Sequence, residues 1–286
     1  MTLQIAKDAI DYIVKNYNFK KENNLLRKTE TVKTVIFFGG EPMLMFDKII
    51  VPLINYIENT YDIKEFQFHI TTNGTLLNKD NINFLKKYNI VPLLSIDGNK
   101  ITQDYNRPCK HSEHSSFDLI YNNIPYILKN FPKTIFRSTV YKDTIQYLFE
   151  NFLFAESMGF KKYTCIPDCR SQNWTTQDIE DYKNQLFLIY NYILNKYQNH
   201  EKPTMNFNNM SKAMSNILFN DINLAMDEET DIDYFISPFR CGLGIISCSV
   251  NYKGEIFSCQ EQDSREYGEY FHIGNIYDGI DVKKHH

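Results

Sequence analysis

The sequence lacks the features that mark several classes of protein. No apolar run approaches the ~18 residues of a membrane-spanning helix, and the longest, Ile49 to Ile57, is interrupted by Asn55. Residues 1–4 lack the charged and apolar regions of a signal peptide. Lys and Arg number 31 against 35 Asp and Glu, a net charge of −4, so there is no electrostatic case for nucleic acid. We expect a soluble, cytoplasmic, globular protein that binds neither nucleic acid nor membranes.

Cysteine is scarce and unevenly placed, and only one tryptophan is present. Residues 1–108 contain no cysteine, and the six that follow are Cys109, Cys165, Cys169, Cys241, Cys248 and Cys259. Because a reducing cytoplasm disfavours disulfides, we interpret them as metal ligands or buried thiols. Cys165 and Cys169 could ligate a metal, but no nearby His or Cys pair completes a zinc site, which favours two ordinary thiols. Cys109 is interpreted as structural or incidental.

Up to Trp174, short apolar runs alternate with amphipathic stretches. The expected strands are 35–38, which has the composition of a buried strand, 66–70, 93–96, 135–140 and 163–166. The expected helices are 3–17 after the N-cap Thr2, about 50–61 after Asp47, 82–88 after Asn78, 116–130, and 143–159 ending on Gly159. This alternation predicts a parallel α/β fold built from βαβ units, as a barrel or an open sheet. Because the first element is a helix, we expect that a strand before Met1 is missing.

The pattern changes after Trp174. Apolar residues from 179 to 193 predict another helix, and a polar stretch from 200 to about 235 follows. Residues 241–280 are rich in Gly, Cys and β-forming residues, and they predict a hairpin that turns near Lys253 and Gly254. We place a domain boundary between residues 200 and 236.

Small polar residues follow three consecutive strands. Gly39-Gly40-Glu41 follows the first, Thr71 to Thr75 the second, and Ser95 to Gly98 the third. In parallel α/β folds, ligands bind at the carboxyl ends of strands. Three independent tight turns would give a similar pattern without a ligand. We favour a binding site at this edge.

These motifs resemble those of radical S-adenosylmethionine (SAM) enzymes. The resemblance rests on Phe37 to Pro42, Thr71 to Leu77, and Ser95 to Gly98 followed by Tyr105 to Pro108. It is greatest to the branch with a C-terminal SPASM or twitch extension, which includes sulfatase-maturating enzymes and maturases of ribosomally made peptides. The resemblance implies a partial (βα)6 TIM-like barrel, here without its first strand, and a C-terminal cysteine-bearing hairpin.

The resemblance also implies roles for individual residues. Gly39, Gly40 and Glu41 would hold the amino end of SAM, and Asn73 would line the same cavity. Ser95 and Arg107 match positions that contact the ribose and the methionyl carboxylate, where a planar guanidinium suits a carboxylate. Asp97 is expected to shape its loop.

A second signature lies near the C-terminus. Cys241-Gly-Leu-Gly, followed later by Gly254-x4-Cys259, resembles the start of a SPASM or twitch module. There the two cysteines would ligate an auxiliary iron–sulfur cluster, and we expect their sulfurs within about 7 Å. Cys248 is either a third ligand or a strand thiol. The implied domains are a partial radical SAM barrel over 1–199, a helical connector over 200–236, and the start of the auxiliary module over 237–286.

The family's radical-generating [4Fe–4S] cluster is held by a Cys-x3-Cys-x2-Cys motif, which this sequence does not contain. We expect either an incomplete and inactive portion of a maturase or a degenerate, non-catalytic paralogue that binds a peptide or SAM. Gln260 follows Cys259 where sulfatase-maturating relatives carry an acidic residue, which favours crosslinking or a similar modification of a precursor peptide. An active enzyme would also need a reducing partner such as flavodoxin or ferredoxin.

Overall fold

The computed structural model describes residues 1–26, 30–109, 114–168, 173–207, 248–259 and 268–281. The chain divides into two compact units. The first unit comprises Met1–Gly40, Leu44–Gln67 and Leu224–His286, and the second unit comprises Glu41–Met43 and Phe68–Asn223. Among the described residues, no helix combines the length and the apolar composition needed to cross a membrane.

A parallel sheet forms the framework of the chain. Its strands follow the chain order: β1 (Lys33–Phe37), β2 (Phe66–Thr72), β3 (Val91–Ser95), β4 (Ile135–Val140), β5 (Lys162–Pro167) and β6 (Asn206–Phe207). The neighbours from β2 to β6 pair in parallel. The predicted parallel α/β class is therefore confirmed, as an open sheet over the described residues. Strand β6 was not predicted, because two residues inside a polar stretch carry no periodic signal.

Helices connect these strands. They are α1 (Leu3–Glu22), α2 (Val51–Thr60), α3 (Lys79–Lys87), α4 (Lys100–Asn106), α5 (Ser116–Tyr121), α6 (Ile124–Asn130), α7 (Leu148–Ser157) and α8 (Thr176–Gln198). The predicted caps Thr2 and Asn78 are confirmed, since Thr2 accepts a hydrogen bond from Ile5 N and Asn78 forms a capping box with Asn81. Gly159 has φ +91°, the left-handed conformation expected after a helix.

Three expectations about helix boundaries are wrong. Asp47 does not cap a helix but lies in a π-helical turn, Phe46–Ile50, and α2 begins beyond it with Pro52 in its first turn. The predicted helix 116–130 is two helices, because Pro125 has no N–H to continue α5 and instead occupies the first turn of α6. The predicted helix 143–159 opens as a 3-10 helix, Lys142–Tyr147, before α7.

Strand β1 is not the buried strand that its composition predicts. Ile36 is 51% exposed, and Phe38 just beyond the strand is 37% exposed. Among the described strands, β1 is the first in the sheet order and has a neighbour on one side only. An edge position therefore explains the exposure of these apolar side chains.

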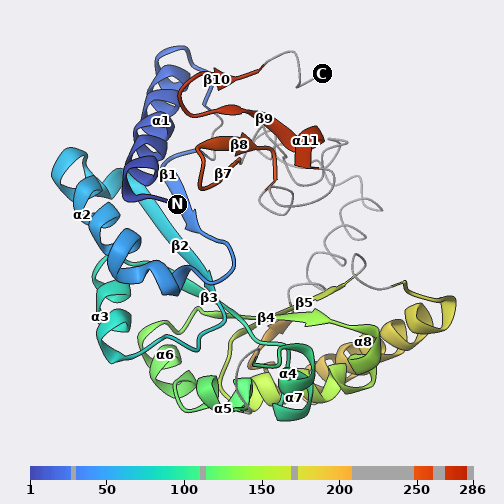
Figure 1. Cartoon of the computed structure of the whole chain (residues 1–286). Coiled ribbons are helices and arrows are strands. Elements are labelled where there is room, and N and C mark those ends of the chain that lie inside the picture. Colours follow the sequence, from blue (N-terminus) through green and yellow to red (C-terminus); the bar gives the residue numbers. More distant parts are fainter. Residues whose placement is uncertain (27–29, 110–113, 169–172, 208–247, 260–267, 282–286) are drawn as a thin grey trace. The chain divides into compact units, whose positions relative to one another are not determined.

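The first unit contains a small antiparallel sheet of β7 (Ser249–Val250), β8 (Glu255–Phe257), β9 (His272–Asn275) and β10 (Gly279–Ile280), with the short α11 (Gly268–Phe271) before β9. The predicted hairpin turn at Lys253 and Gly254 joins β7 to β8 and is confirmed. The sheet lies beside α1 (Figure 1), and Ala9 of that helix forms one apolar cluster with Ile256, Ile273 and Ile276. Burial of this cluster joins the two ends of the chain.

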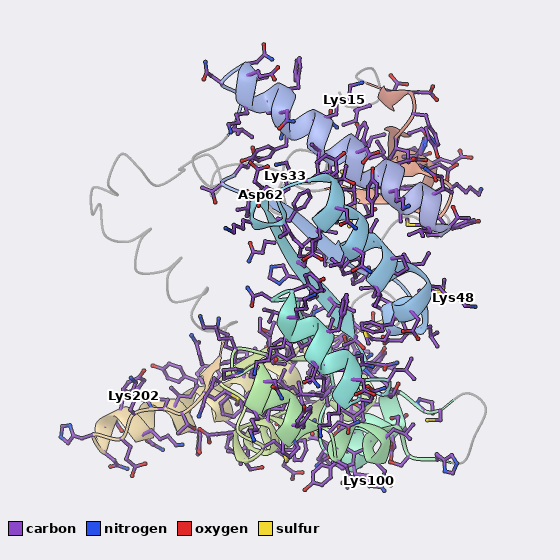
Figure 2. The ribbon with its side chains drawn as sticks, turned by 90° about the vertical axis from the view of Figure 1, so that its left-hand side faces the viewer. Lys15, Lys33, Lys48, Asp62, Lys100 and Lys202 are labelled. Carbon is purple, nitrogen blue, oxygen red and sulfur yellow. The ribbon has the colours of Figure 1, made fainter. Side chains whose placement is uncertain are left out.

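Lys33, labelled in Figure 2, is a buried cation in the first unit. Its ammonium lies 2.7 Å from Glu65 Oε2 and 4.3 Å from the centre of the Tyr17 ring. The carboxylate and the ring face replace the water that burial removes. Lys33 therefore anchors the start of β1.

The core of the second unit is aromatic. Phe136 of β4 and Tyr163 of β5 stack with their ring centres 5.3 Å apart, and Phe152 of α7 contacts Tyr163 edge to face. All three side chains are at most 1% exposed. This packing fixes the helices against β4 and β5, and with them the loops at the strand ends.

Candidate functional site

The glycine pair after β1 leaves open space beside the backbone. Gly39 has φ +145°, a conformation that residues with a side chain rarely adopt. A Cβ atom built at Gly39 or Gly40 would meet no atom within 4 Å. The backbone conformation by itself favours glycine at Gly39, whereas at Gly40 the open space leaves the backbone accessible to a ligand.

Glu41 is held by three donors in the second unit. Its carboxylate accepts hydrogen bonds from the Thr72 hydroxyl (2.7 Å), Asn73 N (2.8 Å) and Met43 N (3.0 Å). Glu41 and Asn73, both predicted site residues, thus lie together at the end of β2. The carboxylate ties this loop to the strand, and both of its oxygens already have protein partners.

The Asn73 side chain shapes the turn that follows β2. Its Oδ1 accepts from Thr75 N (3.0 Å) and from the Thr75 hydroxyl (2.8 Å). Thr72, 1% exposed, accepts from Gly74 N at 3.0 Å. The sequence carries no local signal for this role of Thr72, because the role depends on meeting Glu41 from a distant part of the chain.

The end of β3 carries a buried ion pair. Asp97 is fully buried, and its carboxylate accepts from Arg107 Nε (2.8 Å) and Nη2 (3.0 Å) and from Thr139 N (2.9 Å). Desolvation opposes the charge of Arg107, but the Asp97 carboxylate outweighs it and raises the pKa of the guanidinium. Asp97 shapes its loop as expected and also carries the counter-charge of Arg107. Ser95 begins the same loop and is 9% exposed.

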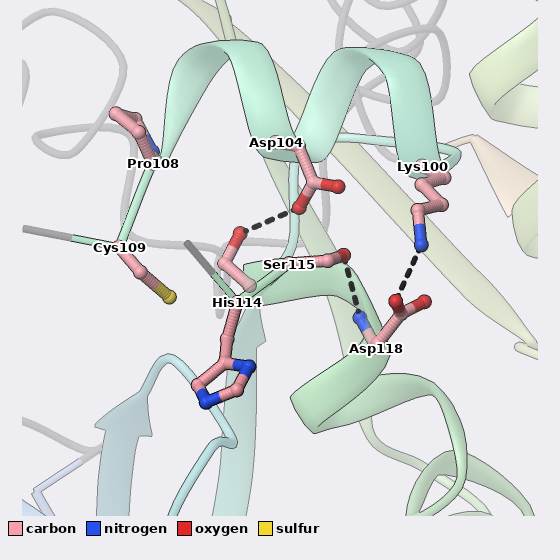
Figure 3. Close-up of a pocket in the computed structure, with 8 residues that line it drawn as sticks. Lys100, Asp104, Pro108, Cys109, His114, Ser115 and Asp118 are labelled. Atoms are coloured by element: carbon pink, nitrogen blue, oxygen red, sulfur yellow. Dashed lines mark hydrogen bonds and ion pairs between the residues drawn. The ribbon is translucent and has the colours of Figure 1, made fainter. Parts of the chain in front are cut away.

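A polar pocket of about 580 Å³ lies beside α4 and α5 (Figure 3). It is lined by Lys100, Asp104, Pro108, Cys109, His114, Ser115, Ser116 and Asp118. Lys100 pairs with Asp118, and Asp104 accepts from the Ser116 hydroxyl (3.2 Å) and Phe117 N (2.9 Å). Cys109 lines this pocket, is half-buried, and belongs to none of the predicted motifs. These interactions hold α5 to α4.

The structure describes part of the predicted auxiliary cysteine set. Cys248 is exposed before β7, and Cys259 is half-buried after β8, whose register pairs Ser249 with Phe257. Cys241 and Cys169 lie outside the described residues, so neither the predicted sulfur distance nor the Cys165–Cys169 pair is tested. Cys165 is buried with Sγ 3.5 Å from the Tyr182 hydroxyl. No group of three or more His, Cys, Asp or Glu side chains in the described residues could hold a metal ion.

Comparison with known proteins identifies related sequences. The model of the Radical SAM superfamily matches residues 15–154. An uncharacterized protein of Methanocaldococcus jannaschii, MJ0907, is 34% identical over 131 residues, 46% of this chain and 40% of that protein. A cysteine-type anaerobic sulfatase-maturating enzyme of Clostridium novyi is 28% identical over 165 residues, 54% of this chain and 44% of the enzyme. The radical SAM cyclopropyl synthase TigE of Paramaledivibacter caminithermalis is 24% identical over 182 residues, 62% of this chain and 36% of the synthase. The chain thus spans about two fifths of the length of these relatives.

Solved structures share the fold. The enzyme anSMEcpe with bound AdoMet has a TM-score of 0.66 and 16% identity over 99% of this chain and 71% of its own. Streptococcus suis SuiB has a TM-score of 0.57 and 18% identity over 91% of this chain and 55% of its own. At these identities the likeness establishes the fold alone.

Proposed function

Because residues 15–154 of this chain form a radical SAM domain, we propose that it is the SAM-binding part of a peptide-modifying maturase. The observation that carries this proposal is the grouping of polar residues in the second unit, where Glu41 and Asn73 meet at the end of β2, Ser95 ends β3, and Arg107, just after α4, pairs with Asp97 in the loop after β3. The neighbouring strands β2 and β3 bring these loops to the same edge.

The residues present suit SAM, which carries an ammonium, a carboxylate and a ribose. Glu41 supplies a negative charge for the ammonium, and its fixed geometry costs no reorganisation on binding. Arg107 supplies a positive charge, and because its hydrogen bonds to Asp97 among the described residues use Nε and Nη2, its Nη1 donors would serve a ligand carboxylate. The Ser95 hydroxyl would serve the ribose, and the open backbone at Gly39 and Gly40 would admit the ligand. When bound, SAM supplies the adenosyl group for the family's radical chemistry.

The radical-generating cluster does not fit the residues of this chain. This sequence contains no Cys-x3-Cys-x2-Cys motif, so its own residues do not supply the three thiolates. The tasks proposed for this chain are therefore binding and orienting SAM.

We propose a precursor peptide as the substrate. Similar proteins support this: a structure of SuiB contains its precursor peptide SuiA, and the related chains include a sulfatase-maturating enzyme and a radical SAM cyclopropyl synthase. Gln260 in place of an acidic residue supports a peptide crosslink or similar modification over sulfatase maturation. Cys241, Cys248 and Cys259 would contribute to an auxiliary cluster, which needs four ligands in all. An active enzyme would receive electrons from a flavodoxin or ferredoxin.

Isothermal titration calorimetry of the full chain with SAM, which measures the dissociation constant, tests the proposal. We expect wild-type protein to bind SAM more tightly than 5′-methylthioadenosine, which lacks the amino and carboxylate groups. The variant Asp97→Asn/Arg107→Ala removes both charges of the pair together and so keeps the fold. It should bind SAM at least tenfold more weakly, from the ~1.5–3 kcal/mol of a hydrogen bond to a charged group.

Lys183→Ala is the control, because Lys183 lies exposed on α8 and pairs only with Glu180 among the described residues. It should bind SAM like wild type. Absence of SAM binding by folded wild-type protein would refute the proposal. Equal binding of SAM and 5′-methylthioadenosine would remove Glu41 and Arg107 from the site.

A further inference from the structure

A buried amide from α7 docks onto the loop after β3. Asn151 is 2% exposed, and its Oδ1 accepts a hydrogen bond from Asn99 N at 2.9 Å. Its Nδ2 donates to Thr102 Oγ1, itself buried, at 3.0 Å. Both ends of the amide are thus bonded to the segment where the loop becomes α4.

The absence of a side chain at Gly98 leaves the space that the Asn151 amide occupies. A Cβ atom at Gly98 would lie 2.1 Å from Asn151 Oδ1 and 2.2 Å from Cγ, closer than any real contact. Asn151 could move aside only by giving up its bonds to Asn99 and Thr102, and buried groups left without partners are costly. Gly98 is therefore required by close approach rather than by an unusual φ.

The loop held in this way carries the proposed SAM-binding groups. Ile96 N donates to Arg137 O at 3.1 Å, and the Ser138 hydroxyl donates to Asp97 O at 2.9 Å, so β4 holds one side of the loop. Asn151 holds the other side. Between these two attachments, Asp97 accepts the hydrogen bonds that orient the Arg107 guanidinium, and Ser95 lies at the start of the loop.

Packing alone does not explain an asparagine at this position. Its neighbours on α7, Leu148, Phe152 and Ala155, are buried apolar residues that pack into the core. An apolar side chain at 151 would avoid burying an amide, but it would leave Asn99 N and Thr102 Oγ1 without this partner. The Asn151 amide is therefore explained by its hydrogen bonds to Asn99 and Thr102, which hold the loop after β3.

We propose that Asn151, matched to Gly98, is a positioning residue for SAM: it fixes the loop that presents Ser95 and the Asp97–Arg107 pair. This inference rests on the proposed function. It predicts that Asn151→Ala weakens SAM binding roughly fivefold, the equivalent of one lost hydrogen bond. Binding of 5′-methylthioadenosine should change less, because that compound has no carboxylate for Arg107.

A double-mutant cycle provides the test. Isothermal titration with SAM and with 5′-methylthioadenosine is carried out on wild type, Asn151→Ala, Gly98→Ala and the double variant, with thermal melting of each. Gly98→Ala should bind SAM more weakly than Asn151→Ala, because the clash displaces the loop. The double variant should bind like Asn151→Ala alone, because the shortened side chain makes room for the new methyl group. Asn191→Ala, an exposed asparagine on α8, is the matched control and should behave like wild type.

The outcomes separate the two proposals. If wild type binds neither ligand, the proposed function fails. If wild type binds SAM but Asn151→Ala binds both ligands as wild type does, the positioning role is wrong. Equal losses for the two ligands would mean that Asn151 supports the fold only. A double variant weaker than either single variant would show that Gly98 and Asn151 act independently, which would also overturn the inference. If Gly98→Ala fails to fold, the ratio of the dissociation constants of Asn151→Ala for SAM and for 5′-methylthioadenosine still tests the positioning role.

Discussion

Truncation of Arg107 tests the buried ion pair most directly. In Arg107→Ala, Asp97 loses the hydrogen bonds of 2.8 and 3.0 Å from the guanidinium and keeps that from Thr139 N. The Asp97 side chain, which has no exposed surface, then lacks the guanidinium that compensates its burial. Breaking a buried pair in this way costs about 3–5 kcal/mol.

The expected cost is at the lower end of that range. The Arg107 side chain is 30% exposed, so water enters the space that it vacates and partly solvates Asp97. We therefore expect the free energy of unfolding to fall by about 2–4 kcal/mol. Asp97→Asn/Arg107→Ala should recover most of this loss, because a neutral amide replaces the stranded charge and still accepts from Thr139 N.

Urea unfolding at pH 7, followed by far-ultraviolet circular dichroism, measures these differences from the transition midpoints. If the two units unfold in separate steps, the transition of the second unit is the one that shifts. A loss below about 1 kcal/mol for Arg107→Ala, the typical effect of an exposed pair, would refute the reasoning. So would a double variant that is less stable than the single one.

Three further predictions follow from the cysteines and from the pocket. After anaerobic reconstitution with iron and sulfide, dithionite and SAM should give no 5′-deoxyadenosine above a no-protein control, because the chain lacks the cysteine triad; turnover would contradict this. Cys165 is buried, which raises the pKa of its thiol to about 11, so it should react with iodoacetamide at pH 8 more slowly than Cys248, which is exposed although desolvation raises its pKa too; peptide mass mapping can show the difference. Desolvation opposes the charge of Asp104, but Phe117 N, the hydroxyls of Ser115 and Ser116, and Lys100 outweigh it and lower its pKa. A lowered carboxyl pKa stabilises the fold above the unfolded pKa and loses this effect as pH falls through the folded pKa. The stability difference between wild type and Asp104→Asn should therefore be full above about pH 5 and shrink below about pH 4, and a pH-independent difference would count against it.

Local signals were the most reliable guide to the fold. Thr2, Asn78 and Gly159 act within a few residues of their own positions, so the sequence pattern was sufficient to predict them. The exposure of Ile36 depends instead on where β1 lies in the strand order, which its own composition does not encode. Strand β6 exists because Asn206 and Phe207 pair with β5, and two residues are too few for a periodic pattern.

The same distinction holds for the site. The motifs indicated that Glu41, Asn73 and Ser95 lie at strand ends, because parallel strands bring their carboxyl ends to one edge, with Arg107 following α4. They did not indicate that Glu41 meets Thr72, since that contact joins segments 31 residues apart. The sequence does place Asn151 as a polar residue on the apolar side of a helix, but its partners Asn99 and Thr102 could be identified only from the structure.

The cluster of Ala9, Ile256, Ile273 and Ile276 has a consequence for the order in which the protein folds. The hydrogen bond from the Tyr277 hydroxyl to Asp8 joins residues 269 positions apart, so part of the first unit rests on contacts between segments that are distant in the sequence. Bringing such segments together costs more conformational entropy than closing a short loop. The paired strands β3, β4 and β5 of the second unit lie much nearer to one another in sequence. We therefore expect the contacts between α1 and the small sheet to form late in refolding, after the core of the second unit.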